Sequence, residues 1–102
     1  VLGDRFGAAA SGEVVDRIEA AFVDAGFVVT RNAPFAGAYI TQAYGKPAKG
    51  QHAVQVEIDR SLYMNEKLIR PNGDFEVIQA ALRQVVKEVA LIGSGRIPLA
   101  AE

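Results

Sequence analysis

The chain has 102 residues, one histidine, no cysteine and a formal net charge of -1. This length corresponds to one modest domain, and the absence of cysteine excludes a disulfide scaffold, a thiolate metal site and a cysteine nucleophile. The nearly neutral charge gives no sign of a nucleic-acid partner, and a single histidine cannot furnish the imidazole-rich ligand set of a catalytic zinc ion.

The first part of the chain predicts a strand end, a helix and a second strand. Residues 1–4 are typical of the end of a buried strand, and Ser11 can cap a helix by accepting from the free amides of its first turn. That helix ends before Gly26, and its apolar residues recur at helical spacing. The apolar run Phe27–Thr30 then predicts a short strand that is buried on both faces.

The second part predicts a long loop, a strand and a helix. Residues 31–51 are punctuated by glycine and proline, which predicts a loop with one short helical turn near 38–43, and such loops are often functional. Residues 52–59 alternate between apolar and polar side chains, as a strand does. Asp74 can cap a second amphipathic helix, which ends at Gly93.

Alternating helices and strands predict an α/β fold with a mostly parallel sheet flanked by helices. Two complete strands and one strand end would leave that sheet incomplete. We expect one domain portion over residues 1–92 and a loosely ordered tail over 93–102.

The ends of the chain give further expectations. No apolar run approaches the roughly 20 residues that cross a bilayer, so we expect no membrane partner. Residues 1–5 also lack the features of a signal peptide, which favours a cytoplasmic protein. Because the chain opens on Val1, it could have a processed terminus, an expression boundary, or an origin as a piece of a larger protein.

Glu57 is the first candidate for chemistry. A carboxylate between apolar neighbours in a strand suits proton transfer, but the same pattern fits a solvated residue or an ion pair with Arg60. His52 could be a metal ligand, a donor to substrate or a structural residue. A nucleophilic triad of Ser61, His52 and Asp59 can be written down, although nothing in the sequence places these side chains in contact.

Four further residues are candidates for binding. Arg31 and Arg60 follow the two predicted strands, where an arginine can bind a carboxylate through two parallel hydrogen bonds or can simply be a surface charge. Asn32 could offer its amide to a ligand or serve the turn before Pro34. Tyr39 could donate its phenolic proton or pack against its neighbours.

The loop and the following strand carry specific motifs. The loop reads N-A-P-F-A-G-A-Y-I-T-Q-A-Y-G-K-P from Asn32, and the strand reads G-Q-H-A-V-Q-V-E-I from Gly50. Together with L-G-D-R-F-G at residues 2–7, these motifs resemble the N-formylglutamate amidohydrolase family. Two positions depart from the family pattern: Ala38 replaces the second glycine of a Gly-Gly pair, and Ala43 replaces a frequent aromatic residue or histidine.

The resemblance implies a zinc-carboxypeptidase-like (phosphorylase/hydrolase-like) fold. It also implies a zinc-dependent hydrolase that splits N-formyl-L-glutamate, a small-molecule substrate, into formate and L-glutamate late in histidine breakdown. The zinc ligands of this family precede the matched region. We therefore expect the ligands upstream of Val1, in a missing N-terminal portion of the same protein, and no activity from this chain alone.

The resemblance gives Glu57 the role of general base and acid. It implies these substrate-binding residues: Arg60, Asn32, Tyr39, His52 and Arg31. Two alternatives stay open. Ala38 could reshape the pocket for another N-acyl amino acid, and the shortage of metal ligands would also fit a non-catalytic binding domain.

Overall fold

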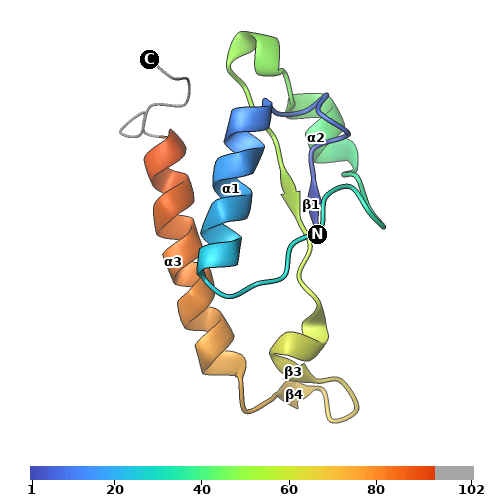
Figure 1. Cartoon of the computed structure of the whole chain (residues 1–102). Coiled ribbons are helices and arrows are strands. Elements are labelled where there is room, and N and C mark those ends of the chain that lie inside the picture. The colour runs from blue at the N-terminus through green and yellow to red at the C-terminus, as the bar shows by residue number, and fades with distance from the viewer. Residues whose placement is uncertain (94–102) are drawn as a thin grey trace.

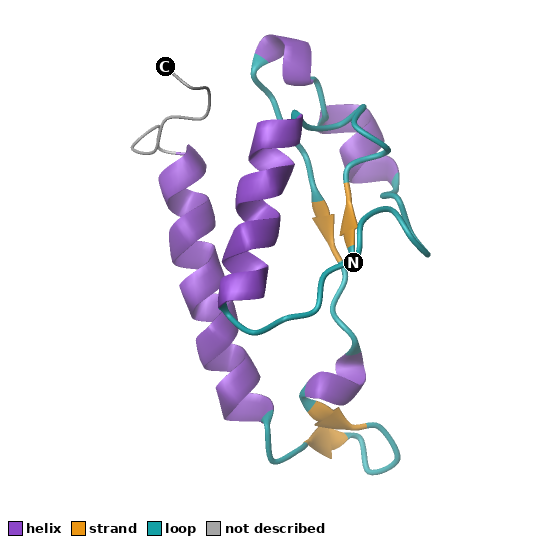
Figure 2. Cartoon of the chain, in the orientation of Figure 1, coloured by secondary structure: helices purple, strands orange, loops and turns teal. Residues whose placement is uncertain are grey.

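The computed structural model describes residues 1–93, which form two long helices beside short strands (Figure 1). Helix α1 (Gly12–Asp24) and helix α3 (Phe75–Gly93) run antiparallel to each other next to strands β1 (Leu2–Gly3) and β2 (Gln55–Val56). The short helix α2 (Tyr39–Tyr44) lies on the other side of these strands (Figure 2). No helix among the described residues is both long and apolar enough to cross a membrane.

Helix α1 is the amphipathic helix that the sequence predicts, and it forms the centre of the core. Its N-cap Ser11 accepts from the backbone N–H of Val14 at 3.4 Å, and Gly26 follows the helix with φ +99°. The core unites one face of this helix with β1 and α3, and its buried residues are Leu2, Ala10, Val14, Val15, Ile18, Ala21, Phe22 and Val85. The rings of Phe22 and Phe27 add an edge-to-face contact, with their centroids 5.5 Å apart.

Helix α3 covers α1 along a narrow stripe. Val85 is buried, whereas Val77 and Val86 are 66% and 65% exposed. The predicted second helix is confirmed up to its end at Gly93. The tail predicted over residues 93–102 lies outside the described residues, apart from that last helical residue.

The prediction of a mostly parallel sheet is wrong for the described residues. Strands β1 and β2 pair antiparallel, with Leu2 opposite Val56 and Gly3 opposite Gln55. A second antiparallel pair, which the sequence did not predict, joins β3 (Met64–Asn65) and β4 (Arg70–Pro71). Parallel pairing is limited, in the part of the chain described, to an isolated bridge between Leu2 and Arg31. The α/β composition is therefore kept, but the strands are shorter and differently oriented.

The segment 27–30 is not a strand, contrary to its apolar composition. It is joined to β1 only at its end, where Thr30 O accepts from Leu2 N and Asn32 N donates to Leu2 O, both at 2.8 Å. Val28 is 96% exposed, so no layer covers the face that the sequence predicted to be buried. The strand predicted over 52–59 likewise shortens to Gln55–Val56.

Candidate functional site

Glu57 follows β2 directly and is one of the residues that line a cavity. Its backbone N–H donates to Val1 O at 2.9 Å, and its carbonyl accepts from Val1 N at 2.8 Å, which extends the pairing of β1 and β2 by one residue on each strand. The cavity has a volume of about 450 Å³ and is lined mainly by apolar side chains, among them Phe22, Phe27 and Phe35. Among the residues to which the resemblance gives a role, all within the described part of the chain, Glu57 is the one that lines it; Asp59, named above for a possible triad, lines it as well.

Gln55 contacts the Glu57 carboxylate, although it was not among the residues predicted for the site. Its Nε2 donates to Oε1 of Glu57 at 3.0 Å, and its Oε1 accepts from the backbone N–H of Ala38 at 2.9 Å. The two residues are two positions apart, which places both side chains on one face of a strand. That spacing was the available signal, but it does not reveal the contact with the loop.

The loop that contains Ala38 crosses β1 at a glycine. A Cβ atom at Gly3 would lie 2.7 Å from both Ala36 C and Gly37 N, so the loop backbone occupies the space of a side chain. Arg5 N also donates to Ala36 O at 2.8 Å. Ala38, where the sequence departs from the family pattern, has φ -123°, so it lies outside the left-handed region that favours glycine. The loop is therefore held close to the face of the strands that carries Gln55.

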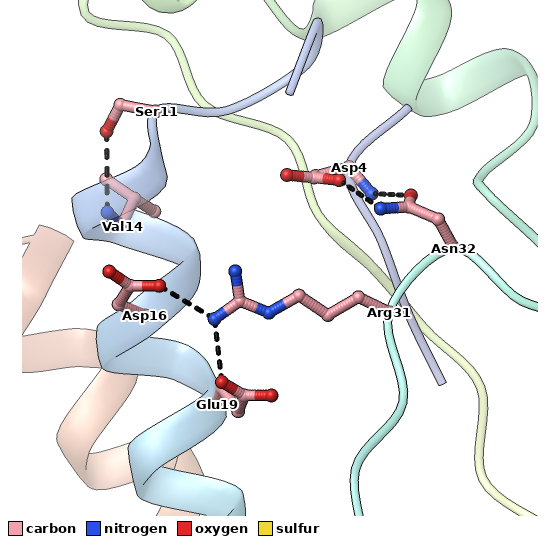
Figure 3. Close-up of polar contacts among 7 residues, drawn as sticks. All are labelled: Asp4, Ser11, Val14, Asp16, Glu19, Arg31 and Asn32. Carbon is pink, nitrogen blue, oxygen red and sulfur yellow. Dashed lines mark hydrogen bonds and ion pairs between the residues drawn. The ribbon is translucent and has the colours of Figure 1, made fainter. Parts of the chain in front are cut away.

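Asn32 braces the segment that follows β1 (Figure 3). Its Oδ1 accepts from the backbone N–H groups of Asp4 at 3.1 Å and Phe6 at 3.3 Å, and its Nδ2 donates to the buried Asp4 carboxylate at 2.8 Å. Asn32 has φ +59°, a left-handed conformation that asparagine adopts more readily than most residues. Both polar atoms of its side chain thus have partners within the chain, while its role toward a substrate stays a prediction.

Arg31 and Arg60 have different surroundings. Arg31 forms ion pairs at 2.7 Å with Asp16 and Glu19 of α1 (Figure 3). Hydrogen bonds to Asp16 and then to Glu19 raise the pKa of its guanidinium group. Arg60, at the start of a short helical turn, is 68% exposed and lies 3.6 Å from Glu66. Arg60 is therefore the arginine with more freedom to bind a ligand.

His52 joins the start of α1 to the chain before β2. Its Nδ1 accepts from the backbone N–H of Ser11 at 3.0 Å, which leaves Nε2 as the nitrogen that can donate. The triad considered above is not assembled: Ser61 Oγ donates to Asp59 at 2.7 Å, but His52 is engaged with Ser11 instead. The two hydrogen bonds from Ser61 lower the pKa of the Asp59 carboxyl group.

Tyr39 is the first residue of α2 and is 72% exposed, so its phenol points away from the core. Within residues 1–93, no group of three or more His, Cys, Asp and Glu side chains is placed to hold a metal ion. The described residues therefore do not fit a zinc site of their own.

Comparison with known proteins places the chain in a family. The family model for N-formylglutamate amidohydrolase matches residues 1–64. An N-formylglutamate deformylase from Pseudomonas putida is 39% identical over 66 residues, which are 64% of this chain and 25% of that protein. A protein of the same name from Pseudomonas aeruginosa is 34% identical over 98 residues, covering 93% of this chain and 36% of that protein.

A solved structure agrees with these matches. The crystal structure of an N-formylglutamate amidohydrolase from Ralstonia eutropha has a TM-score of 0.82 and 32% identity to this chain, covering 92% of this chain and 34% of that one. The chain thus spans between a quarter and about a third of the length of these relatives. Because the family model covers more than half of its residues, this chain belongs to the N-formylglutamate amidohydrolase family.

Proposed function

We propose that this chain is the C-terminal portion of an enzyme that hydrolyses N-formyl-L-glutamate to formate and L-glutamate, with Glu57 as general base and acid. The observation that carries the proposal is that Glu57 lines a mainly apolar cavity, while Gln55 Nε2 donates to one oxygen of its carboxylate. Membership of the family supports the substrate, since the relatives are named for N-formylglutamate.

In the proposed reaction, Glu57 moves one proton. Its carboxylate takes a proton from the attacking water as the water oxygen bonds to the formyl carbon. The C–N bond then breaks, and the leaving nitrogen takes that proton from Glu57. Gln55 Nε2 donates to Oε1 of Glu57, and we propose that the proton is exchanged at Oε2, which has no contact with Gln55. The cavity beside Glu57 is also lined by aromatic rings, such as those of Phe22 and Phe35.

The proposal assigns the substrate carboxylates chiefly to Arg60. This side chain is 68% exposed, and its contact with Glu66 is long enough to exchange for a ligand. Asn32 and Arg31 remain candidates, but each would have to exchange partners that it already has inside the chain. Tyr39 and the Nε2 of His52 are proposed as donors to the oxygen that becomes negative during the reaction.

Zinc belongs to the same proposal. The family resemblance implies zinc dependence and ligands that precede the matched region, so we propose that the ligands lie upstream of Val1. A zinc-carboxypeptidase-like fold for the complete enzyme, a place in histidine degradation and a cytoplasmic location complete the proposal. The fold and the pathway rest on the resemblance.

The substrate can be tested with a small panel of compounds. We expect the complete protein to release formate from N-formyl-L-glutamate with a kcat/KM at least about tenfold above that for N-formyl-L-aspartate, because one methylene changes specificity by about 10- to 200-fold. N-acetyl-L-glutamate should also be a poor substrate. Faster turnover of the acetyl compound would support a different N-acyl amino acid, and binding without turnover of any compound would support a binding domain.

The role of Arg60 gives a second test in the complete protein. The Arg60→Gln variant should raise KM for N-formyl-L-glutamate about tenfold or more, because it removes a charged hydrogen bond to a carboxylate. Steady-state kinetics measure this change. Arg83→Gln is the matched control, since Arg83 is an exposed residue of α3 that does not line the cavity. An unchanged KM for Arg60→Gln would remove Arg60 from the substrate site.

A further inference from the structure

The side chain of Gln55 joins two parts of the site that are distant in the sequence. Its two hydrogen bonds, at 2.9 Å to Ala38 N and at 3.0 Å to Glu57 Oε1, connect the loop across β1 to the proposed catalytic carboxylate. The loop can reach Gln55 because Gly3, the residue opposite Gln55 on β1, has no side chain in the way.

The orientation of the Gln55 amide is fixed by the chemistry of its partners. The Ala38 N–H can only donate, so it needs the carbonyl oxygen of Gln55, and an ionised Glu57 carboxylate can only accept, so it needs the amide nitrogen. A flipped amide would set oxygen against oxygen and N–H against N–H. One orientation therefore satisfies both neighbours.

This arrangement restricts the motion of Glu57. A glutamate side chain has several rotatable bonds and changes rotamer unless its surroundings hold it. The bond from Gln55 holds Oε1 of Glu57 in the described structure and leaves Oε2 without that contact. Because the same Gln55 amide is bound to the loop, displacement of Ala38 would release the group that orients the carboxylate.

We infer that Gln55 is a positioning residue, which holds the Glu57 carboxylate in its reactive orientation only while the loop around Ala38 lies against β1. The inference rests on the proposed function, since it matters to catalysis only if Glu57 transfers the proton. Gln55 itself does not exchange a proton with the substrate; it acts through Glu57.

The Gln55→Glu variant separates orientation of Glu57 from anchoring of the loop. A glutamate of nearly the same shape still accepts from Ala38 N–H, but it has no donor for Glu57 and sets two carboxylates against each other. We expect kcat for N-formyl-L-glutamate hydrolysis by the complete protein to fall by about 10- to 100-fold, with KM within about twofold of the parent value. A role in loop anchoring alone would leave kcat nearly unchanged.

Two further variants complete the experiment. Gln55→Met removes both hydrogen bonds without adding charge, and it should also lower kcat at least about tenfold; it carries the test if Gln55→Glu does not fold. Gln51→Glu is the matched control, because it makes the same chemical change at an exposed residue four positions earlier and should leave kcat and KM unchanged. Circular dichroism and thermal unfolding check that each variant is folded.

The outcomes distinguish this inference from the proposed function. If Glu57→Gln abolishes turnover but the folded Gln55 variants keep kcat within about twofold of the parent, the positioning role is wrong and the function of Glu57 stands. If Glu57→Gln retains full activity, the proposed function fails first. A loss of kcat in the Gln55 variants, with unchanged kcat in the Gln51→Glu protein, supports both the positioning role of Gln55 and the general-base role of Glu57.

Discussion

Replacing Glu57 with glutamine in the complete protein should lower kcat by about 10²- to 10⁴-fold, the usual contribution of a positioned general base. The amide has nearly the shape of the carboxylate, and its oxygen can still accept from Gln55 Nε2. It cannot take a proton from water, however. The loss should therefore appear in turnover, while the fold and the binding of N-formyl-L-glutamate are largely kept.

Three measurements check this expectation. Formate release gives kcat, calorimetric titration gives substrate affinity, and metal analysis shows whether the complete protein keeps the same metal content. Glu76→Gln is the matched control, because Glu76 is an exposed carboxylate in the first turn of α3. Near-normal turnover by folded Glu57→Gln protein would show that another group moves the proton.

A methyl group at Gly3 should also have a large effect. Its Cβ would lie 2.7 Å from Ala36 C and Gly37 N, and both are backbone atoms that cannot rotate out of the way. We expect Gly3→Ala to lower the free energy of unfolding by about 1–3 kcal/mol, the typical cost of overpacking. Because the loop must move off β1, the contact between Ala38 and Gln55 should be lost and activity should fall with it.

Gly12→Ala is the control for this change. Gly12 is the first residue of α1, and a Cβ there meets nothing within 4 Å, so alanine should leave stability equal or slightly higher. Denaturant unfolding of both variants measures the difference. If Gly3→Ala is as stable as the parent and keeps full activity, the position of the loop does not depend on the absence of a side chain at Gly3.

The helices of this fold could be predicted because local signals determine them. Ser11, the apolar spacing of α1 and Gly26 specify a start, a face and an end within a short stretch of chain. The strands are only two residues long, and β1 pairs with the distant β2, so the direction of that pairing could not be deduced from composition. The segment 27–30 has the composition of a buried strand, yet Val28 is 96% exposed because no neighbouring layer covers it.

The part of the site that lies on the strand predicted over residues 52–59 could be predicted from the sequence. Alternation in residues 52–59 singled out Glu57, and the same alternation could have indicated Gln55. The contact of Gln55 with Ala38 depends on a loop 17 residues earlier in the chain, which no local pattern encodes. The ion pairs of Arg31 could not be predicted for a similar reason, because its partners Asp16 and Glu19 lie on α1, 12 or more residues earlier in the chain.

The close approach between the loop and the strands limits how this site can be redesigned. The segment around Ala38 is held from two strands at once, by Arg5 after β1 and by Gln55 on β2, and it needs Gly3 beneath it. A loop from a relative with different specificity could not be grafted by exchanging residues 31–45 alone. The exchange would also have to include Gly3 to Arg5 and Gln55, which hold the loop. A change of substrate would therefore require coordinated substitutions in three separate stretches of sequence.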